Sequence, residues 1–241
     1  MIIEGINCAN ELLKAGYPVE KVIINKESNT KLDEIINLCT KSQVKYEVVD
    51  KKGLERIAKS SHHQGVIAFV KPYEYCFVED ILRLAEQKQE DPFILILDGI
   101  EDPHNVGALI RTAECLGVHG VIIPKNRACE INETVFKTSA GAIAHMKVAQ
   151  VTNISQTIDK LKDKNIWCYA LEAGNNVLQD TNLQGGVALV VGSEGKGVSK
   201  LVTKTCDATI SIPMFGAINS LNASNAGAIA MYEVVRQKKG K

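Results

Sequence analysis

A single arginine stands in a helical segment that carries little other charge. The segment 97–124 predicts a buried strand, a loop, a short helix and a second buried strand. Arg111 lies in that helix, three and four residues after Ala108 and Gly107. Because helical side chains lean toward the N-terminus, these small residues leave room for the guanidinium to reach the start of the helix. In open α/β sheets that end lies over the carboxyl edge of the strands, where ligands bind.

The start of the same helix carries an amide. Asp102 and Pro103 are typical of an N-cap and a first helical residue. Asn105 follows in the loop or first turn, six residues before Arg111 and therefore off its helical stripe. The two residues could belong to a reaction site. Alternatively, Asn105 closes a turn while Arg111 pairs with one of the nearby carboxylates, which are Asp98, Glu101 and Asp102.

A second motif, GSEGKG, follows a buried strand at 192–197, with Glu194 among its three glycines, the first of which is Gly192. Glycines permit positive φ and a close approach of backbone to a ligand. A Walker-type phosphate loop is excluded because it needs a lysine directly after its second motif glycine, whereas Val198 follows Gly197. The dinucleotide pattern G-x-G-x-x-G is also missing. The alternative is a tight turn in which Glu194 favours the dipole of the next helix.

A third motif covers 211–233, where Ile212 ends a strand and Met214 begins a loop. Ser220 and Asn222 follow, and either side chain could cap the last helix. Small residues then recur at helical spacing and form a smooth stripe that permits close packing; they are Ala223, Ala226, Gly227 and Ala230. Capping and packing explain the small residues, but they do not explain why a loop holds Leu221 and its neighbours.

Composition limits the class of protein. A chain of 241 residues with 45% hydrophobic and 23% charged residues is typical of one or two globular domains. No apolar run approaches the ~18 residues of a membrane span, and the N-terminus does not resemble a signal peptide, so we expect no membrane association and a cytoplasmic location. Seven scattered cysteines without C-x-x-C indicate reduced thiols. The five histidines show no metal-ligand spacing, so no metal site is expected.

A net charge of zero argues against a protein that coats nucleic acid nonspecifically. It remains compatible with a structured RNA that is bound through local patches. We count six acidic residues between positions 72 and 92, against two basic ones, so acidic charge collects between two mildly basic halves.

The first half of the chain predicts a small α/β unit. Helices are expected at 4–15, 31–40 and 51–58, and strands at 19–24, 44–49 and 65–70. A further helix at 78–89 would lead into the second half. The expected domains are therefore 1–72, a linker and connecting helix at 73–92, and 93–241.

The second half alternates strands and helices. Strands are expected at 93–97, 120–123, 147–151, 166–171, 187–191 and 209–212, and helices near 104–116, 132–144, 154–164, 197–204 and 222–237. Strands this uniformly apolar are buried on both faces. The predicted class is therefore α/β, with a parallel sheet that is covered by helices on both faces.

Taken together, the three motifs resemble those of a known family. D-P-x-N-x-G-A-x-x-R-T-A at 102–113, G-S-E-G-x-G at 192–197 and I-P-M-x-G-x-x-x-S-L-N at 212–222 are similar to the motifs of the SpoU (TrmH-type) branch of the SPOUT RNA methyltransferases. The first unit, with EGIN near its start and SHHQG at 61–65, resembles the RNA-substrate-binding domain of many members. The resemblance is closest to the bacterial 23S rRNA guanosine 2′-O-methyltransferase type.

The resemblance implies a deep trefoil knot in the C-terminal sheet, S-adenosylmethionine as cofactor, a homodimer and an RNA substrate, 23S rRNA. It implies that Arg111 is the catalytic arginine and Asn105 its positioning amide. The remaining catalytic-site residues would be Glu194, Ser220 and Asn222. Backbone near the cofactor would be that of Gly192, Ile212, Met214 and Leu221. Asn225 is a departure, because members often carry an aliphatic residue there. A 2′-hydroxyl target also excludes DNA as a substrate.

Two other functions remain open. One is a tRNA ribose 2′-O-methyltransferase of the same fold; the appended first domain and Gly107-Ala108 favour rRNA by resemblance. The other is a catalytically silent RNA-binding protein of ribosome assembly, although a pure binder would not need five intact catalytic-site residues. A dehydrogenase fits the alternation of strands and helices but lacks the glycine fingerprint.

Overall fold

The computed structural model describes residues 1–27, 30–61, 63–174 and 176–239; position 62, in the SHHQG motif, lies outside them. The chain forms two compact units, which are described separately. Unit 1 contains Met1–Glu74 and Ile131–His145. Unit 2 contains Tyr75–Glu130 and Met146–Lys241. A segment from the second half of the sequence therefore belongs to the first unit.

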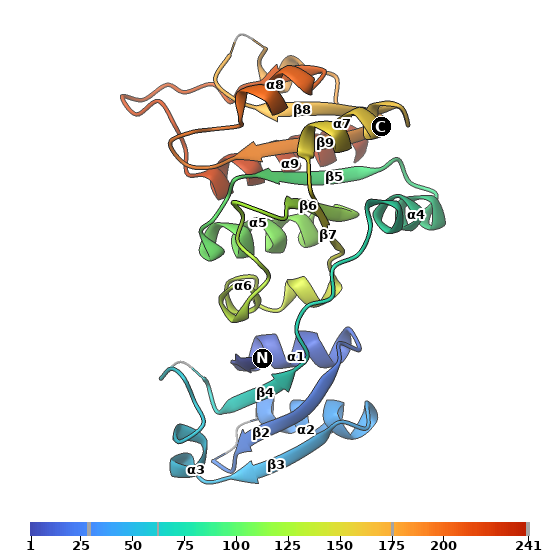
Figure 1. The fold of residues 1–241 in the computed structure, drawn as a ribbon. Helices are drawn as coiled ribbons and strands as arrows, with labels where there is room; N and C mark the ends of the chain where they lie inside the picture. Colours follow the sequence, from blue (N-terminus) through green and yellow to red (C-terminus); the bar gives the residue numbers. More distant parts are fainter. Residues whose placement is uncertain (28–29, 62, 175, 240–241) are drawn as a thin grey trace. The chain divides into compact units, whose positions relative to one another are not determined.

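Unit 2 is built on a parallel sheet of six strands (Figure 1). Their spatial order is β10-β8-β9-β5-β6-β7, and every pair is parallel. The bounds are β5 Phe93–Asp98, β6 Gly120–Pro124, β7 Val148–Val151, β8 Ile166–Leu171, β9 Gly186–Gly192 and β10 Ala208–Ile210. All seven residues of β9 are buried, as are the first five of β5. The predicted parallel sheet is confirmed, and its burial explains why its strands are so uniformly apolar.

Helices cover both faces of this sheet (Figure 1). The bounds are α4 Val78–Lys88, α5 Pro103–Cys115, α7 Ile154–Lys162, α8 Lys200–Thr205 and α9 Ala223–Lys239, with a 3-10 turn at Leu178–Asp180. One face packs its side chains against α4, α7 and α8, with Ile81, Ile158 and Val202 in the shared core. The other face carries α5 and α9.

The stripe of small residues on α9 is a contact with α5. A Cβ atom added to Gly227 would lie 2.4 Å from Cδ2 of Leu109 on α5 and 3.4 Å from Cγ2 of Val191 on β9. Only a residue without a side chain lets these elements approach so closely. The close approach joins the two helices that carry Asn105 and Asn222 at their starts.

Unit 1 has a mixed sheet of four strands in the order β1-β4-β2-β3. Its elements are β1 Ile2–Glu4, α1 Ile6–Lys14, β2 Val19–Asn25, α2 Thr30–Lys41, β3 Lys45–Val49, α3 Lys51–Glu55 and β4 Val66–Val70. β4 is antiparallel to β1 and β2, and β2 is parallel to β3. The α/β character of the first half is confirmed, but β1 was not predicted. Its three residues are ordered by pairing with β4, far away in sequence.

The prediction of one helix at 132–144 is wrong. The segment forms α6 Glu133–Thr138 and a 3-10 turn at Ala142–His145. Ala140 and Gly141 break it with φ values of 53° and 87°. A Cβ on Gly141 would lie 2.8 Å from Cβ of Glu11, so packing against α1 fixes the break. Phe136 of α6 lies edge-on to Tyr17, with 5.4 Å between ring centroids.

No helix of the described residues is long and apolar enough to cross a membrane.

Candidate active site

The GSEGKG motif folds back on itself at the end of β9. Gly197 donates its N–H to the carbonyl of Ser193 (2.9 Å), and the two residues pair as an antiparallel bridge. A Cβ on Gly192 would lie only 2.0 Å from the carbonyl carbon of Gly197, so the returning backbone occupies that space. Gly195 and Gly197 have φ values of 82° and 64°, which glycine adopts without strain. This turn delays the next helix: α8 begins at Lys200, whereas the sequence predicted 197.

Two carboxylates hold the returning strand of the motif. The backbone N–H of Val198 donates to Oε1 of Glu172, and that of Ser199 donates to Oδ2 of Asp98 at 2.7 Å. Glu172 follows β8, and Asp98 ends β5. The loop is therefore anchored on the strands that lie on either side of β9 in the sheet.

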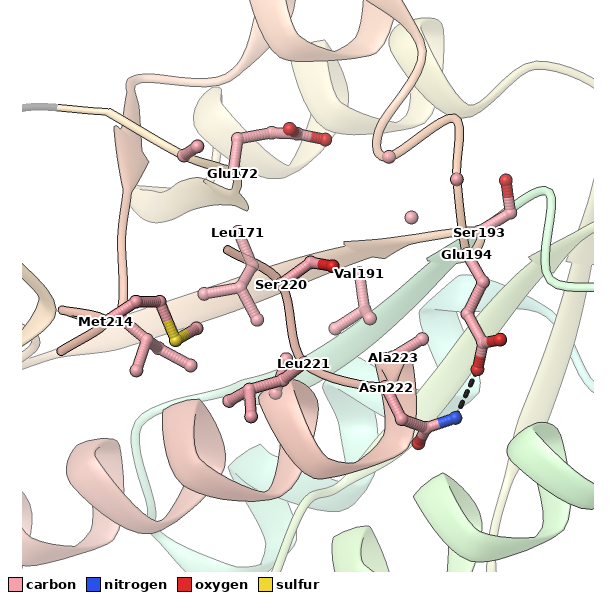
Figure 2. A pocket seen from close by; sticks show the side chains of 16 residues that line it. Leu171, Glu172, Val191, Ser193, Glu194, Met214, Ser220, Leu221, Asn222 and Ala223 are labelled. Atoms are coloured by element: carbon pink, nitrogen blue, oxygen red, sulfur yellow. Dashed lines mark hydrogen bonds between the residues drawn. The ribbon is translucent and has the colours of Figure 1, made fainter. Parts of the chain in front are cut away.

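Three of the predicted site residues meet in a hydrogen-bonded triangle. Nδ2 of Asn105 donates to Oε1 of Glu194 at 2.9 Å. Nδ2 of Asn222 donates to Oδ1 of Asn105 at 2.9 Å. The same nitrogen also donates to Oε1 of Glu194 (Figure 2). The residues come from α5, the loop after β9 and the start of α9. The alternative in which Glu194 only favours a helix dipole is therefore too narrow, because its carboxylate accepts from both amides.

Asn222 also starts α9. Its Oδ1 accepts from the backbone N–H groups of Ser224 (2.9 Å) and Asn225 (3.3 Å) and from the hydroxyl of Ser224 (2.5 Å). These groups would otherwise lack partners in the first turn of the helix. Of the two predicted capping residues, Asn222 is the one that caps. Its oxygen holds the helix while its nitrogen holds the triangle.

Arg111 lies on the exposed surface of α5. The predicted cap of that helix is present: the carboxylate of Asp102 accepts from the N–H groups of His104 (3.1 Å) and Asn105 (3.4 Å). Within the described residues Arg111 forms no ion pair, so its pairing with Asp98, Glu101 or Asp102 is not found. It also forms no hydrogen bond with the triangle. The guanidinium is available to a ligand.

A cavity of about 570 Å³ opens beside the triangle. The four residues expected near a cofactor all line it; they are Gly192, Ile212, Met214 and Leu221. Glu194, Ser220 and Asn222 line it as well. Figure 2 shows Met214, Leu221 and Leu171 on one side of the opening and Glu194 with Ser193 on the other. Arg111 and Asn105 are not among the lining residues.

Sequence reasoning did not assign Leu171, Glu172 or Val191 to the site, although all three line this cavity. Leu171 and Glu172 stand at the carboxyl end of β8, which the sequence predicted correctly. Because the carboxyl ends of parallel strands share one edge, a polar residue directly after a predicted strand was the available signal.

The buried cysteines are unsuited to nucleophilic roles. Burial raises the pKa of Cys8 to about 11 and that of Cys206 to about 12, so both thiols stay protonated near neutral pH. In the described part of the chain, no cluster of His, Cys, Asp or Glu could hold a metal ion.

Comparison with known families covers both halves of the chain. Residues 92–232 match the model of the SpoU rRNA Methylase family. Residues 2–76 match the model described as RNA 2′-O ribose methyltransferase substrate binding. The two matches place the triangle and the cavity within the first family's region.

Curated relatives match over nearly their full length. A protein named TrmH family tRNA/rRNA methyltransferase from Staphylococcus aureus (strain MSSA476) is 42% identical over 240 residues, which is 98% of this chain and 96% of the relative. The Bacillus subtilis (strain 168) protein YacO, of the same description, is 41% identical over 238 residues, covering 97% and 94%.

Solved structures share the fold. The SpoU methyltransferase AviRb from Streptomyces viridochromogenes, in complex with AdoMet, matches with a TM-score of 0.81 and 23% identity, over 98% of this chain and 90% of that one. An rRNA methyltransferase from Sinorhizobium meliloti, also AdoMet-bound, matches with a TM-score of 0.77 and 19% identity, over 98% and 86%.

Proposed function

Because the chain belongs to the SpoU family of S-adenosylmethionine-dependent RNA ribose 2′-O-methyltransferases, we propose that its substrate is a guanosine 2′-hydroxyl of 23S rRNA. In this proposal residues 1–72 bind the RNA, 73–92 connect, and 93–241, with a trefoil knot, transfer the methyl group. The enzyme would act as a cytoplasmic homodimer. The observation that carries the site is the triangle of Asn105, Glu194 and Asn222, two members of which line the cavity.

The cavity suits S-adenosylmethionine. Apolar side chains, those of Val191, Ile212 and Leu221, offer a surface for an adenine ring, and the bare backbone at Gly192 permits close approach. Carboxylates of Glu172 and Glu194 also line it, and they complement a positively charged ligand. When bound, the cofactor supplies an electrophilic methyl group on a sulfonium.

Arg111 would act on the substrate side. A guanidinium keeps its proton above pH ~12, so it is not the base that deprotonates the 2′-hydroxyl. Two donors in a rigid fork instead suit the neighbouring phosphate and the developing alkoxide, while the proton passes to water or phosphate. The exposed, unpaired position of Arg111 supports this role.

The triangle would fix the positions of the loop after β9 and the loop before α9 relative to α5. Asn105 shares its helix with Arg111, and Glu194 and Asn222 line the cavity. Their three hydrogen bonds join the substrate-side helix to the cofactor-side loops. Such positioning can supply a large part of a methyl-transfer rate, because a bimolecular step becomes effectively unimolecular.

The test is transfer of labelled methyl from S-adenosylmethionine to 23S rRNA, 16S rRNA and tRNA, each purified from cells that lack this protein. We expect label in 23S rRNA alone, and loss of label with Arg111→Ala. Label in tRNA alone would replace the proposed substrate, and the relatives' shared tRNA/rRNA description makes tRNA the necessary comparison. Cofactor binding without transfer to any RNA or ribosomal precursor would leave a silent binding protein.

A second variant tests the role of the arginine. Arg111→Lys keeps the charge but loses the bidentate fork, so we expect turnover to fall roughly as far as in Arg111→Ala. Affinity for S-adenosylmethionine, measured by calorimetry, should stay unchanged in both. Near-normal turnover in Arg111→Lys would contradict the proposed role.

A further inference from the structure

A second cavity lies beside the first in unit 2. Its volume is about 590 Å³, and its walls come from the loops that follow β5, β6, β7 and β9. It therefore occupies the same carboxyl edge of the parallel sheet as the cofactor cavity, where ligands of such sheets bind. Ser193 and Gly197 line both cavities, so one loop separates them.

Three cations line this second cavity: Arg127, Lys196 and Lys200. All three are exposed, and none forms an ion pair with any residue that the structure describes. Of the two carboxylates present, Asp98 already accepts from the N–H of Ser199. The lining thus has an excess of positive charge that is not paired by any carboxylate of the described residues.

The backbone at Arg127 is unusual. Its φ of 57° is in the left-handed region, which a non-glycine residue adopts at a cost. Gly99 also has a positive φ and also lines the cavity. A Cβ atom added to Gly99 would lie 4.0 Å from the carbonyl oxygen of Arg127. Both loops at the rim thus have conformations that L side chains rarely adopt, and such backbone is typical of functional sites.

The start of α7 adds to the positive potential. Asn153 and Ser155 line the cavity, and the Asn153 side chain caps the helix by accepting from the N–H of Gln156 at 3.1 Å. A helix N-terminus carries a partial positive charge. Together with the three cations, it favours an anion with several oxygens.

We infer that this cavity binds a backbone phosphate of the RNA strand beside the methylated nucleotide. The inference rests on the proposed function and extends it to the substrate path. A strand whose ribose is presented at the loop Ser193–Gly197 must continue on one side of that loop. The cofactor cavity occupies the other side, and the second cavity offers unpaired cations to a phosphodiester.

The test uses the full-length protein and 23S rRNA from cells that lack it. The double variant Arg127→Gln/Lys200→Gln removes two cations that line the second cavity but not the cofactor cavity, and Lys204→Gln is the matched control. Lys204 lies on the same helix as Lys200 and is exposed, but it does not line the cavity. For each protein we would measure KM for RNA, kcat, cofactor affinity and the salt dependence of RNA binding.

We expect the double variant to raise the KM for RNA roughly tenfold. The slope of the logarithm of the RNA-binding constant against the logarithm of the salt concentration should become shallower by about 0.7 for each phosphate that is no longer neutralised. Cofactor affinity and melting temperature should match those of Lys204→Gln. A KM and slope equal to those of the control would overturn the inference while the methyltransferase function stands. If the wild type methylates no RNA, the proposed function fails; the salt slope of RNA binding still decides the inference.

Discussion

Replacing Gly192 by alanine tests the geometry of the cofactor loop most directly. The added Cβ would lie 2.0 Å from the carbonyl carbon of Gly197 and 2.2 Å from its oxygen and from the nitrogen of Val198. Ordinary contacts of Cβ atoms begin near 3.4 Å, so the returning backbone must move by about 1.4 Å. All the nearest atoms belong to the backbone, so no side chain can rotate away.

The cost follows from that displacement. Forcing an extra carbon into a packed site typically costs about 1–3 kcal/mol. For a chain of this size, such a loss lowers the melting temperature by roughly 2–12 °C. The moved loop lines the cofactor cavity and carries Glu194, and a misplacement of ~1 Å can reduce a rate about 100-fold. We therefore expect cofactor affinity to fall at least tenfold and turnover to fall further.

Calorimetry with S-adenosylmethionine, thermal denaturation and methyl transfer would measure the three effects. Gly174→Ala is the control, because its Cβ would have Thr209 Oγ1 at 3.5 Å as nearest atom and its φ is not positive. If Gly192→Ala binds the cofactor within twofold of the wild type and melts with the control, the close return of the loop is refuted.

Asn222→Asp keeps the oxygen that caps α9 but places a second carboxylate against that of Glu194. Turnover should therefore fall about 100-fold, while the melting temperature changes little. Unchanged turnover would show that the triangle is not needed for catalysis. A second prediction concerns pH. Burial lowers the pKa of His119, despite its hydrogen bond to Glu90, and its Nδ1 accepts from the N–H of Phe93 at 3.0 Å. The unfolded chain therefore takes up this proton first, and the melting temperature should drop as pH falls below about 6.5. His119→Gln should flatten that drop, and an unchanged profile would assign it to other groups.

Local rules were sufficient for much of the fold. The strands of unit 2 are apolar along their whole length because both faces are covered, and turn residues bound them. The Asp102 cap depends only on the residues that directly follow it and was therefore predictable. The break in the helix expected at 132–144 was not predictable. The apolar spacing of that segment gives no sign of the left-handed turn at Ala140 and Gly141, which contact with α1 imposes.

The site residues were predictable in type but not in contact. Asn105 and Glu194 are 89 positions apart, and Asn105 and Asn222 are 117 apart, so no periodicity joins them. Family motifs selected the three residues, whereas the sheet order that brings their loops together is a property of the whole fold. Glu172 belongs to no motif quoted above, and its role as a loop anchor became visible only in three dimensions.

The discontinuity of unit 1 has a consequence for how the chain is made. During synthesis, residues 1–74 leave the ribosome well before 131–145, which complete that unit. Until then, the surface that will receive the fully buried Phe136 is open, and the backbone N–H of Ile2 lacks its acceptor, Glu133. The first unit therefore cannot mature before strand β6 of the second has been made. A chain cut after residue 74 would therefore separate the first part of unit 1 from the segment 131–145 that completes it.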